Sequence, residues 1–293
     1  MEVTEHVIAC TLTVLYLPGG PSSDKLPRRR WQKIDRAIRR WAADLDNVQS
    51  VLEKEGFWLE SAVIGRPGLL SLAEKYVLDR RVLVACQDRY PSRWLSTLGE
   101  SAPPVLWLRG EMPSGPFFGL AGSRRVEPST LSFASRCGEE AVSRGYCLLS
   151  GGASGCDRAA AQGALGASIA AAGEPRLCEI LPYGLNDAHP VSWCRLSLAP
   201  PAEGFSTAYA MERNALIYAA GPRSLVAHSR FKVGGAWHGA VDCLRRRLSR
   251  LFVREDHSEA ARALSSLGAV PVGDAAEPFE IEVSEQQHAL TWN

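Results

Sequence analysis

The chain has 293 residues, of which 46% are hydrophobic, so it is long enough for one large domain with a substantial core and a smaller second domain. Its 33 Lys and Arg residues balance 32 Asp and Glu residues, so the formal net charge of +1 argues neither for nor against a polyanionic partner. No pair of cysteines has C-x-x-C spacing, which argues against a zinc or redox site of that type and favours reduced, buried thiols. The eight cysteines are Cys10, Cys86, Cys137, Cys147, Cys156, Cys178, Cys194 and Cys243.

The amino-terminal region is expected to be helical. Its first apolar run, residues 7–17, follows the acidic stretch MEVTEH and is shorter than the roughly 20 apolar residues that span a bilayer, so we expect a cytoplasmic protein without a membrane partner. Between residues 25 and 79, apolar residues recur three or four positions apart, with arginines on the other faces. These apolar residues are Trp31, Ile34, Ile38, Trp41 and Leu45. We therefore predict a small helical domain over residues 1–87.

A boundary is expected after this domain, because residues 88–116 contain five of the 18 prolines. Apolar runs then alternate with helical patterns. The expected strands are 117–123, 146–150, 177–184, 224–229 and 250–255. The expected helices are 129–145, 156–167, 206–220 and 236–248. This alternation predicts an α/β domain over residues 88–273, with a doubly wound, mostly parallel sheet covered by helices, followed by an acidic tail over 274–293.

Ligands of such sheets bind beyond the carboxyl ends of the strands, so the loops that follow strands are informative. The first is AGSRR, in which Gly122 permits a tight turn, Ser123 supplies a hydroxyl, and two guanidiniums can pair with phosphate oxygens. These guanidiniums belong to Arg124 and Arg125. An ordinary turn with two solvated arginines explains the same residues.

The second loop runs from Ser150 to Arg158 and contains Gly151, Gly152 and Gly155. Its backbone N–H groups are expected to face an anion at the start of a helix. Ser154 and Asp157 also fit an S-x-x-D capping box, which needs no ligand but leaves the three glycines unexplained. Because neither G-x-G-x-x-G nor a Walker A motif is present, a standard dinucleotide or P-loop site is not expected.

Two further segments carry polar residues toward the same end of the sheet. Arg213 and Asn214 interrupt an apolar helical pattern and lie either on a solvated face or over the site. In SRFKVGGAWHG, Gly234 and Gly235 begin a helix, Lys232 precedes them, and Trp237 follows. Trp237 is either a core residue or a platform for base stacking.

Two glycine-rich helix starts with arginines and a tryptophan favour a ligand that has phosphate and a base, meaning a nucleotide or single-stranded nucleic acid. No nucleophile–histidine motif, H-E-x-x-H motif or acidic metal cluster occurs, so neither catalysis nor a cofactor or metal is indicated. The basic runs are read as solvated helix faces, with a phosphate-tracking role as the alternative. They are residues 28–30, Arg36, Arg39, Arg40, residues 245–247 and Arg250.

These segments, in the same order, resemble the bacterial DNA-processing protein A (DprA, or Smf) family over roughly residues 88–272. The resemblance implies a Rossmann-like domain after a helical domain. It also implies a homodimer that binds single-stranded DNA with little sequence preference and helps to load a RecA-type recombinase during transformation. Related Rossmann-like domains include sensors of nucleotide signals and phosphoribohydrolases.

By position in the family, residues 122–124, 150–157, 213–214 and 234–240 match the phosphate-facing segments. The chain departs from the family pattern at Ser154, where an arginine is usual, so Arg158 or Arg125 would have to supply that phosphate contact. The segment VGG replaces the commoner Ser-Gly-Ser, as in a divergent branch found in mobile or defence contexts. Residues 274–293 are too few for the winged helix that some members carry.

The leading hypothesis is therefore a non-catalytic single-stranded DNA-binding protein of DNA processing and recombination. The alternative is a nucleotide-signal sensor that uses the same pocket. A phosphoribohydrolase is least favoured, because GGAWHGAVD offers only Asp242 as a carboxylate, beyond the usual position.

Overall fold

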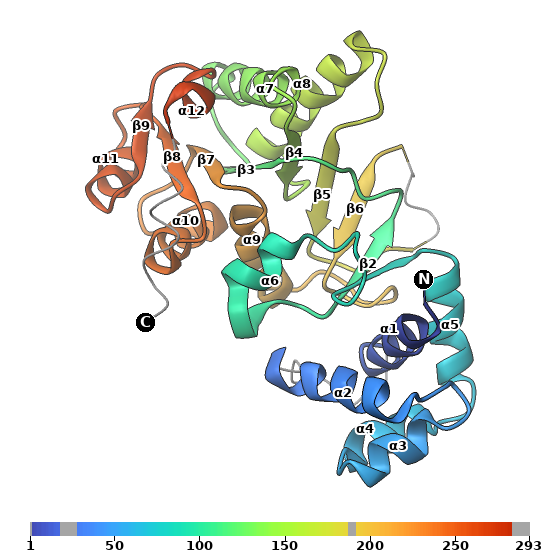
Figure 1. Ribbon diagram of the computed structural model, residues 1–293. Helices are drawn as coiled ribbons and strands as arrows, with labels where there is room; N and C mark the ends of the chain where they lie inside the picture. The colour runs from blue at the N-terminus through green and yellow to red at the C-terminus, as the bar shows by residue number, and fades with distance from the viewer. Residues whose placement is uncertain (1, 18–27, 187–191, 283–293) are drawn as a thin grey trace. The chain divides into compact units, whose positions relative to one another are not determined.

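The computed structural model describes residues 2–17, 28–186 and 192–282 (Figure 1). The chain forms two compact units. The first consists of residues 1–112 and 181–209, and the second of residues 113–180 and 210–293. The first unit thus extends beyond the expected boundary at residue 87 and includes a segment from the middle of the expected second domain.

The first unit begins with the expected helical domain. Helix α1 (Val3–Leu15) has every residue from Val7 to Leu15 buried, and it packs against α2 (Arg28–Trp41), α4 (Trp58–Ile64) and α5 (Leu69–Leu78). Helix α3 (Val48–Lys54) packs against α2 and α4. The apolar run at residues 7–17 is therefore mostly the central helix of this unit. Within the described residues, no helix has the length and apolar character needed to cross a membrane.

Helix α2 follows the predicted amphipathic pattern over most of its length. Trp31, Ile34 and Ile38 are buried as their spacing predicts, whereas Trp41, in the last turn, is 43% exposed. Half-buried Leu45 lies beyond the end of the helix. The amphipathic helix therefore ends earlier than the apolar spacing indicates.

Three strands in antiparallel pairing complete the first unit. Strand β2 (Val105–Arg109) pairs with β1 (Val82–Val84) and with β6 (Cys194–Ser197). Trp107 is the partner of Val82 on one side and of Ser197 on the other. Helix α6 (Ser92–Leu98) and a 3-10 turn (Gly99–Ser101) lie between β1 and β2 in the chain. Strands β1 and β6 were not predicted, because three or four residues are too few to show a period.

The described part of the second unit contains six parallel strands in the order β5-β4-β3-β7-β8-β9. They are β3 (Phe117–Gly122), β4 (Cys147–Ser150), β5 (Leu177–Leu181), β7 (Arg223–His228), β8 (Arg250–Arg254) and β9 (Val270–Val272). The chain proceeds outward from β3 to β5, then returns to the other side of β3 and proceeds outward again. This order confirms the predicted doubly wound, mostly parallel, Rossmann-like sheet, and it puts the topological switch point between β3 and β7.

Among the residues that the structure describes, six helices belong wholly or mainly to this unit. They are α7 (Pro128–Ser143), α8 (Cys156–Ala170), α9 (Thr207–Ala219), α10 (Gly234–Arg246), α11 (Glu259–Ser266) and α12 (Glu277–Glu280). Helices α7 and α8 pack on each other (Figure 1). Helix α8 also packs on β3 and β4, α7 on β4 and β7, and α10 on β7 and β8. Small residues allow α7 and α8 to approach closely: a Cβ on Gly138 would lie 2.0 Å from the carbonyl oxygen of Ala160. The alanine-rich composition of α8 therefore serves helix packing.

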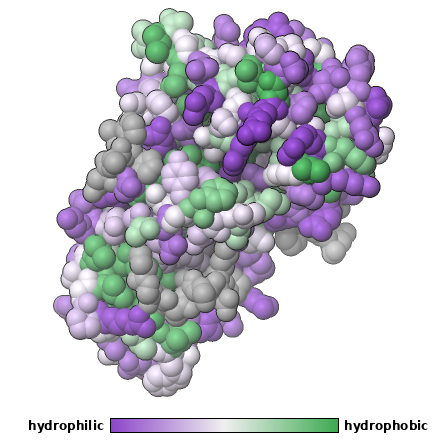
Figure 2. Space-filling view, turned by 180° about the vertical axis from the view of Figure 1, so that it is seen from behind, coloured by the Kyte–Doolittle hydropathy of each residue, from purple (hydrophilic) through white to green (hydrophobic). Residues whose placement is uncertain are grey.

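The described part of the expected tail is ordered against the sheet. The ring of Phe279 lies 4.6 Å from that of Phe118 and 5.4 Å from that of Tyr146. Arg223 Nη1 donates to the carbonyl oxygens of Pro278 and Ile281, each at 2.6 Å. On the face seen in Figure 2, hydrophilic side chains predominate and hydrophobic ones form separate small groups, as is usual for a surface in water.

Candidate phosphate-binding site

The site lies at the switch point of the second unit, where the carboxyl ends of β3 and β7 meet. The backbone N–H of Ser123 donates to the carbonyl oxygen of His228 at 3.0 Å, which joins the loop after β3 to the end of β7. The register of these two strands shifts between Ala121 and Gly122. Gly122 is also required by packing, since a Cβ there would stand 2.4 Å from the Cβ of Cys156.

Asp157 connects the first and second loops. Its Oδ1 accepts a hydrogen bond from the N–H of Gly122 at 3.2 Å, and its Oδ2 accepts from the N–H groups of Gly151 at 3.1 Å and Ala153 at 3.4 Å. Two N–H groups of the second loop, which was expected to present its N–H groups to an anion, therefore already bind a carboxylate of the chain itself. The side chain of Asp157 is 3% exposed, so it organises the loops from within.

The capping box proposed for Ser154 and Asp157 is wrong. The N-cap of α8 is Gly155, with φ of +81°, and no side chain caps the helix. Ser154 is exposed, and Asp157 is bound to the loops described above. Gly155 is needed at this position because a Cβ would stand 2.4 Å from the carbonyl oxygen of Ser123 and 2.5 Å from that of Arg124. Half-buried Gly152, with φ of +63°, supplies the other left-handed residue of the loop.

Arg213 and Asn214 on α9 point into the protein, which rules out the solvated-face interpretation. They are 7% and 6% exposed. Arg213 Nη1 lies 4.0 Å from Asp157 Oδ2, and Asn214 Nδ2 donates to the carbonyl oxygen of Gly235 at 3.1 Å. Burial lowers the pKa of Arg213 and raises the pKa of Asp157, while their mutual attraction opposes both changes. Arg213 thus connects α9 to the second loop through Asp157, and Asn214 connects α9 to the start of α10.

Several buried polar atoms of these segments have no hydrogen-bond partner among the described residues: Ser150 Oγ, Arg213 Nε, His228 Nδ1 and Ser229 Oγ. Buried polar groups are nearly always paired, because an unpaired one costs about 1–3 kcal/mol. These four come from β4, α9 and the end of β7. Their hydrogen-bonding capacity is unmet by the described residues, and two of them, those of His228 and Ser229, were not among the residues predicted from sequence.

Cationic side chains lie on the same loops or next to them in the sequence. Arg124, Arg125, Arg158 and Lys232 are exposed. Lys232 has φ of +56° in a tight turn that Val233 closes by donating to the carbonyl oxygen of Arg230 at 3.1 Å. Gly234, with φ of +81°, and Gly235 follow as the exposed first residues of α10.

Trp237 packs in the core, so it is the core residue and not the base-stacking platform of the two interpretations given above. It is 6% exposed and meets the ring of Phe231 edge-on, with 5.1 Å between centroids. Its indole face is therefore covered by the protein. Lys232 Nζ lies 4.8 Å from the centroid of the Phe231 ring, so Phe231, which was not predicted, is the aromatic side chain beside the cation.

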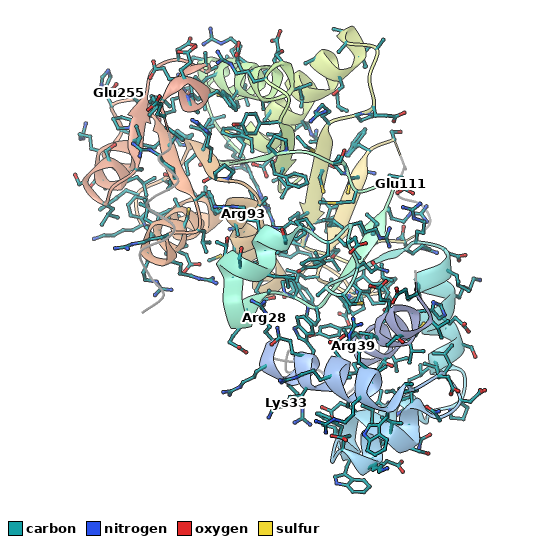
Figure 3. All side chains as sticks on the ribbon, viewed as in Figure 1. Arg28, Lys33, Arg39, Arg93, Glu111 and Glu255 are labelled. Atoms are coloured by element: carbon teal, nitrogen blue, oxygen red, sulfur yellow. The ribbon has the colours of Figure 1, made fainter. Side chains whose placement is uncertain are left out.

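The long basic runs are largely occupied by partners within the protein. On α2, which carries Arg28, Lys33 and Arg39 (Figure 3), the guanidinium of Arg30 binds Glu60 at 2.5 and 2.9 Å, and that of Arg39 binds Asp35 at 3.1 Å. On α10, Arg245 and Arg246 both bind Asp242. These contacts favour the interpretation of the basic runs as solvated helix faces over a phosphate-tracking role. Among the described residues, no group of three or more His, Cys, Asp or Glu side chains is arranged to hold a metal ion.

Comparison with known proteins gives two kinds of match. The family model of DNA recombination-mediator protein A matches residues 81–247. DNA-processing protein A from Streptococcus pneumoniae has a structure that matches with a TM-score of 0.64 and 16% identity, covering 97% of this chain and 100% of that one. The protein of the same name from Helicobacter pylori, whose structure concerns a single-stranded DNA binding mode, matches with a TM-score of 0.52 and 20% identity, covering 60% of this chain and 85% of that one. No curated protein matches in sequence.

Proposed function

Because the chain belongs to the DNA recombination-mediator protein A family, we propose that it binds single-stranded DNA, without catalysis, through the loops at the carboxyl ends of β3, β4 and β7. The observation that carries this proposal is the coincidence, on the same loops, of unpaired buried polar atoms and exposed cations. The Helicobacter pylori relative, whose structure concerns a single-stranded DNA binding mode, supports the choice of ligand.

The chemistry of these groups matches a phosphate backbone. Guanidinium groups pair with phosphate oxygens in a fork, and hydroxyl and backbone N–H groups donate to the remaining oxygens. Such contacts carry no sequence information, so binding should tolerate any base. Each phosphate neutralised releases counterions, so the logarithm of affinity should fall with the logarithm of salt concentration by about 0.7 per contact.

We further propose that the protein acts in the cytoplasm as a homodimer and delivers the bound strand to a RecA-type recombinase. This part rests on the family alone. DNA uptake in transformation, repair and defence are the processes in which such delivery is useful.

Fluorescence anisotropy of a labelled single-stranded oligonucleotide across a salt series tests the proposal. Arg124→Ala and Lys232→Asn should each weaken binding about three- to tenfold and reduce the salt slope. Asn replaces Lys232 because it tolerates a positive φ. The control is Arg262→Ala, which removes an exposed arginine on α11, a helix that contributes no residue to these loops. Affinities equal to that of the control would refute the site.

A second candidate is a sensor that holds a free nucleotide in the same loops. The burial of Arg213 and of the unpaired hydroxyls favours it. Buried groups of the protein can surround the phosphate of a small ligand more completely than a phosphate within a strand. Displacement of the oligonucleotide by micromolar mononucleotide would support the sensor. Failure of millimolar mononucleotide to compete would eliminate it.

A further inference from the structure

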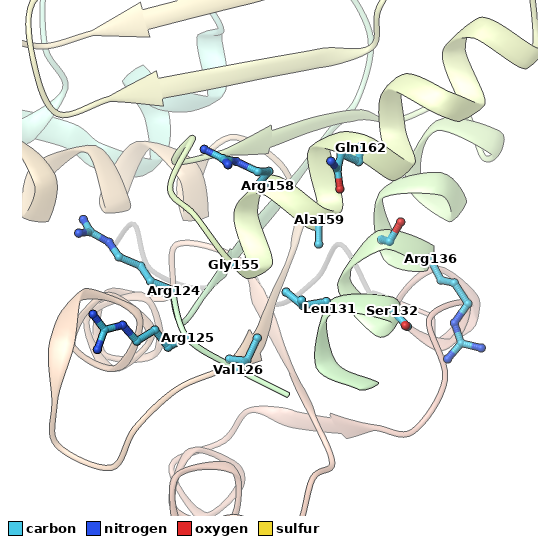
Figure 4. A pocket seen from close by; sticks show the side chains of 11 residues that line it. Arg124, Arg125, Val126, Leu131, Ser132, Arg136, Gly155, Arg158, Ala159 and Gln162 are labelled. Atoms are coloured by element: carbon cyan, nitrogen blue, oxygen red, sulfur yellow. The ribbon is translucent and has the colours of Figure 1, made fainter. Parts of the chain in front are cut away.

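A pocket of about 820 Å³ lies beside the loop that follows β3, at the first turns of α7 and α8 (Figure 4). It shares Arg124, Arg125, Gly155 and Arg158 with the candidate site. Its other wall comes from α7, a helix to which neither the sequence motifs nor the proposed function gives a role. The pocket is therefore an extension of the phosphate-binding loops onto the α7–α8 pair.

Four arginines give this pocket a strong positive charge. Arg124 and Arg125 come from the loop, Arg158 from α8, and Arg136 extends from α7 on the other side of the pocket (Figure 4). None of the eleven described residues that line it is acidic. Within the described residues, these four guanidiniums form no ion pair of the kind that occupies the arginines of α2. They are therefore free to bind an anion.

The surface between these cations is apolar. Val126, Leu131 and Ala159 form it, with polar groups from Ser132 and Gln162 beside it. Aliphatic side chains can contact the face of a base, planar guanidiniums can stack on it, and a carboxamide can bond to its edge. A volume of about 820 Å³ lies within the range of about 300–1,000 Å³ typical of small-molecule sites. Cations on two sides of an apolar surface suit a base with phosphates attached.

We propose that this pocket binds a nucleoside phosphate, either as one unit of a bound DNA strand or as a free nucleotide. The strand form rests on the proposed function, because the residues that the pocket shares with the candidate site would let one strand pass from the switch point into the pocket. The free form requires only the pocket itself. Arg136 is the residue that this inference adds to the binding surface.

Two variants test the pocket. Ser132→Trp fills it without changing charge, and Arg136→Ala removes one cation. Both positions are exposed on α7, so folding should be preserved, and equal melting temperatures would verify this. Arg262→Ala is the charge-matched control outside the pocket. Binding of a labelled 20-nucleotide oligothymidylate is measured by anisotropy, and binding of deoxyadenosine monophosphate by saturation-transfer NMR.

If the pocket holds part of a strand, both variants should bind the oligonucleotide about three- to tenfold more weakly than the control, with the salt slope of Arg136→Ala lower by about 0.7. If it holds a free nucleotide, Ser132→Trp should lose the monophosphate signal while its oligonucleotide affinity is unchanged. Variants that match the control with both ligands would overturn the pocket while leaving the proposed function intact. Absence of oligonucleotide binding by the natural chain would instead refute the proposed function, and the monophosphate measurement would still decide the pocket.

Discussion

The guanidinium of Arg213 lies directly against the backbone of Gly151. A Cβ on Gly151 would stand only 1.6 Å from Arg213 Nη1. The same glycine donates its N–H to Asp157, the carboxylate nearest to Arg213. The absence of a side chain at Gly151 therefore makes room for a buried arginine, and the loop is shaped by the protein's own ion pair as well as by any ligand.

Gly151→Ala should displace Arg213. The guanidinium cannot keep its place beside the new methyl group, so its pairing with Asp157 is weakened in a buried setting. We expect the free energy of unfolding to fall by about 1–3 kcal/mol, with a parallel loss of oligonucleotide affinity. Urea denaturation measures the first effect. Gly166→Ala is the control: this exposed α8 position has open space for a Cβ, and alanine there should raise stability by roughly 0.5–1 kcal/mol. Equal effects of the two substitutions would contradict the Arg213 contact.

Gly155→Ala and Gly234→Ala separate backbone conformation from crowding. Both glycines have φ of +81°, where alanine is strained by about 1–3 kcal/mol. With ψ of −128°, Gly155 also lies outside the left-handed helical region, so its backbone strain adds to the crowding described next. At Gly155 the methyl group would also meet two backbone carbonyls of the first loop, whereas at Gly234 nothing lies within 4 Å. Gly155→Ala should therefore destabilise the protein more and reduce oligonucleotide affinity more. Denaturant titration and anisotropy of both variants test this, and a larger effect of Gly234→Ala would oppose it.

Asp157→Asn should be strongly destabilising. It leaves Arg213 buried without its carboxylate and replaces an oxygen that accepts hydrogen bonds by an NH₂ group that cannot. Removing one partner of a buried ion pair typically costs about 3–5 kcal/mol. A double variant that also carries Arg213→Met should lose less than the sum of the single variants, because the unpaired charge is gone. Chemical denaturation of the four proteins gives the coupling energy, and strict additivity would show that the two side chains do not interact.

The second unit was largely predictable because its signals are local. The apolar run before the glycine loop gives β4, and the helix begins at Cys156 as expected from the glycines that precede it. The role of Asp157 was not predictable, since its partner Gly122 is 35 positions away and its spacing from Ser154 imitates a capping box. Trp237 was open to two interpretations, because the sequence does not show whether its indole packs against a neighbouring ring, as it does against Phe231, or stays open to a ligand.

Short or distant elements were missed. Strand β9 has three residues and includes Pro271, which is unusual in a strand, and α12 has four residues in a stretch read as an acidic tail. The allocation of residues 181–209 to the first unit reflects the pairing of β6 with β2, a contact between residues almost 90 positions apart. Arg136 gave no signal at all, because a single arginine on an amphipathic helix is typical of a solvated face.

The buried thiols predict how stability depends on pH. Burial raises the pKa of Cys10 and of Cys156 from the ordinary value of 9.0 to about 12. Above pH 9 the unfolded chain loses these protons while the folded chain keeps them, so the free energy of unfolding should be highest below pH 9 and fall as pH rises toward 12. The slope is about 1.4 kcal/mol per pH unit for each thiol. Urea denaturation under reducing conditions at pH 8, 9 and 10 measures it, and Cys156→Ala should make the decline shallower. Stability that is constant or rises over this range would show that the thiols are not protected by burial.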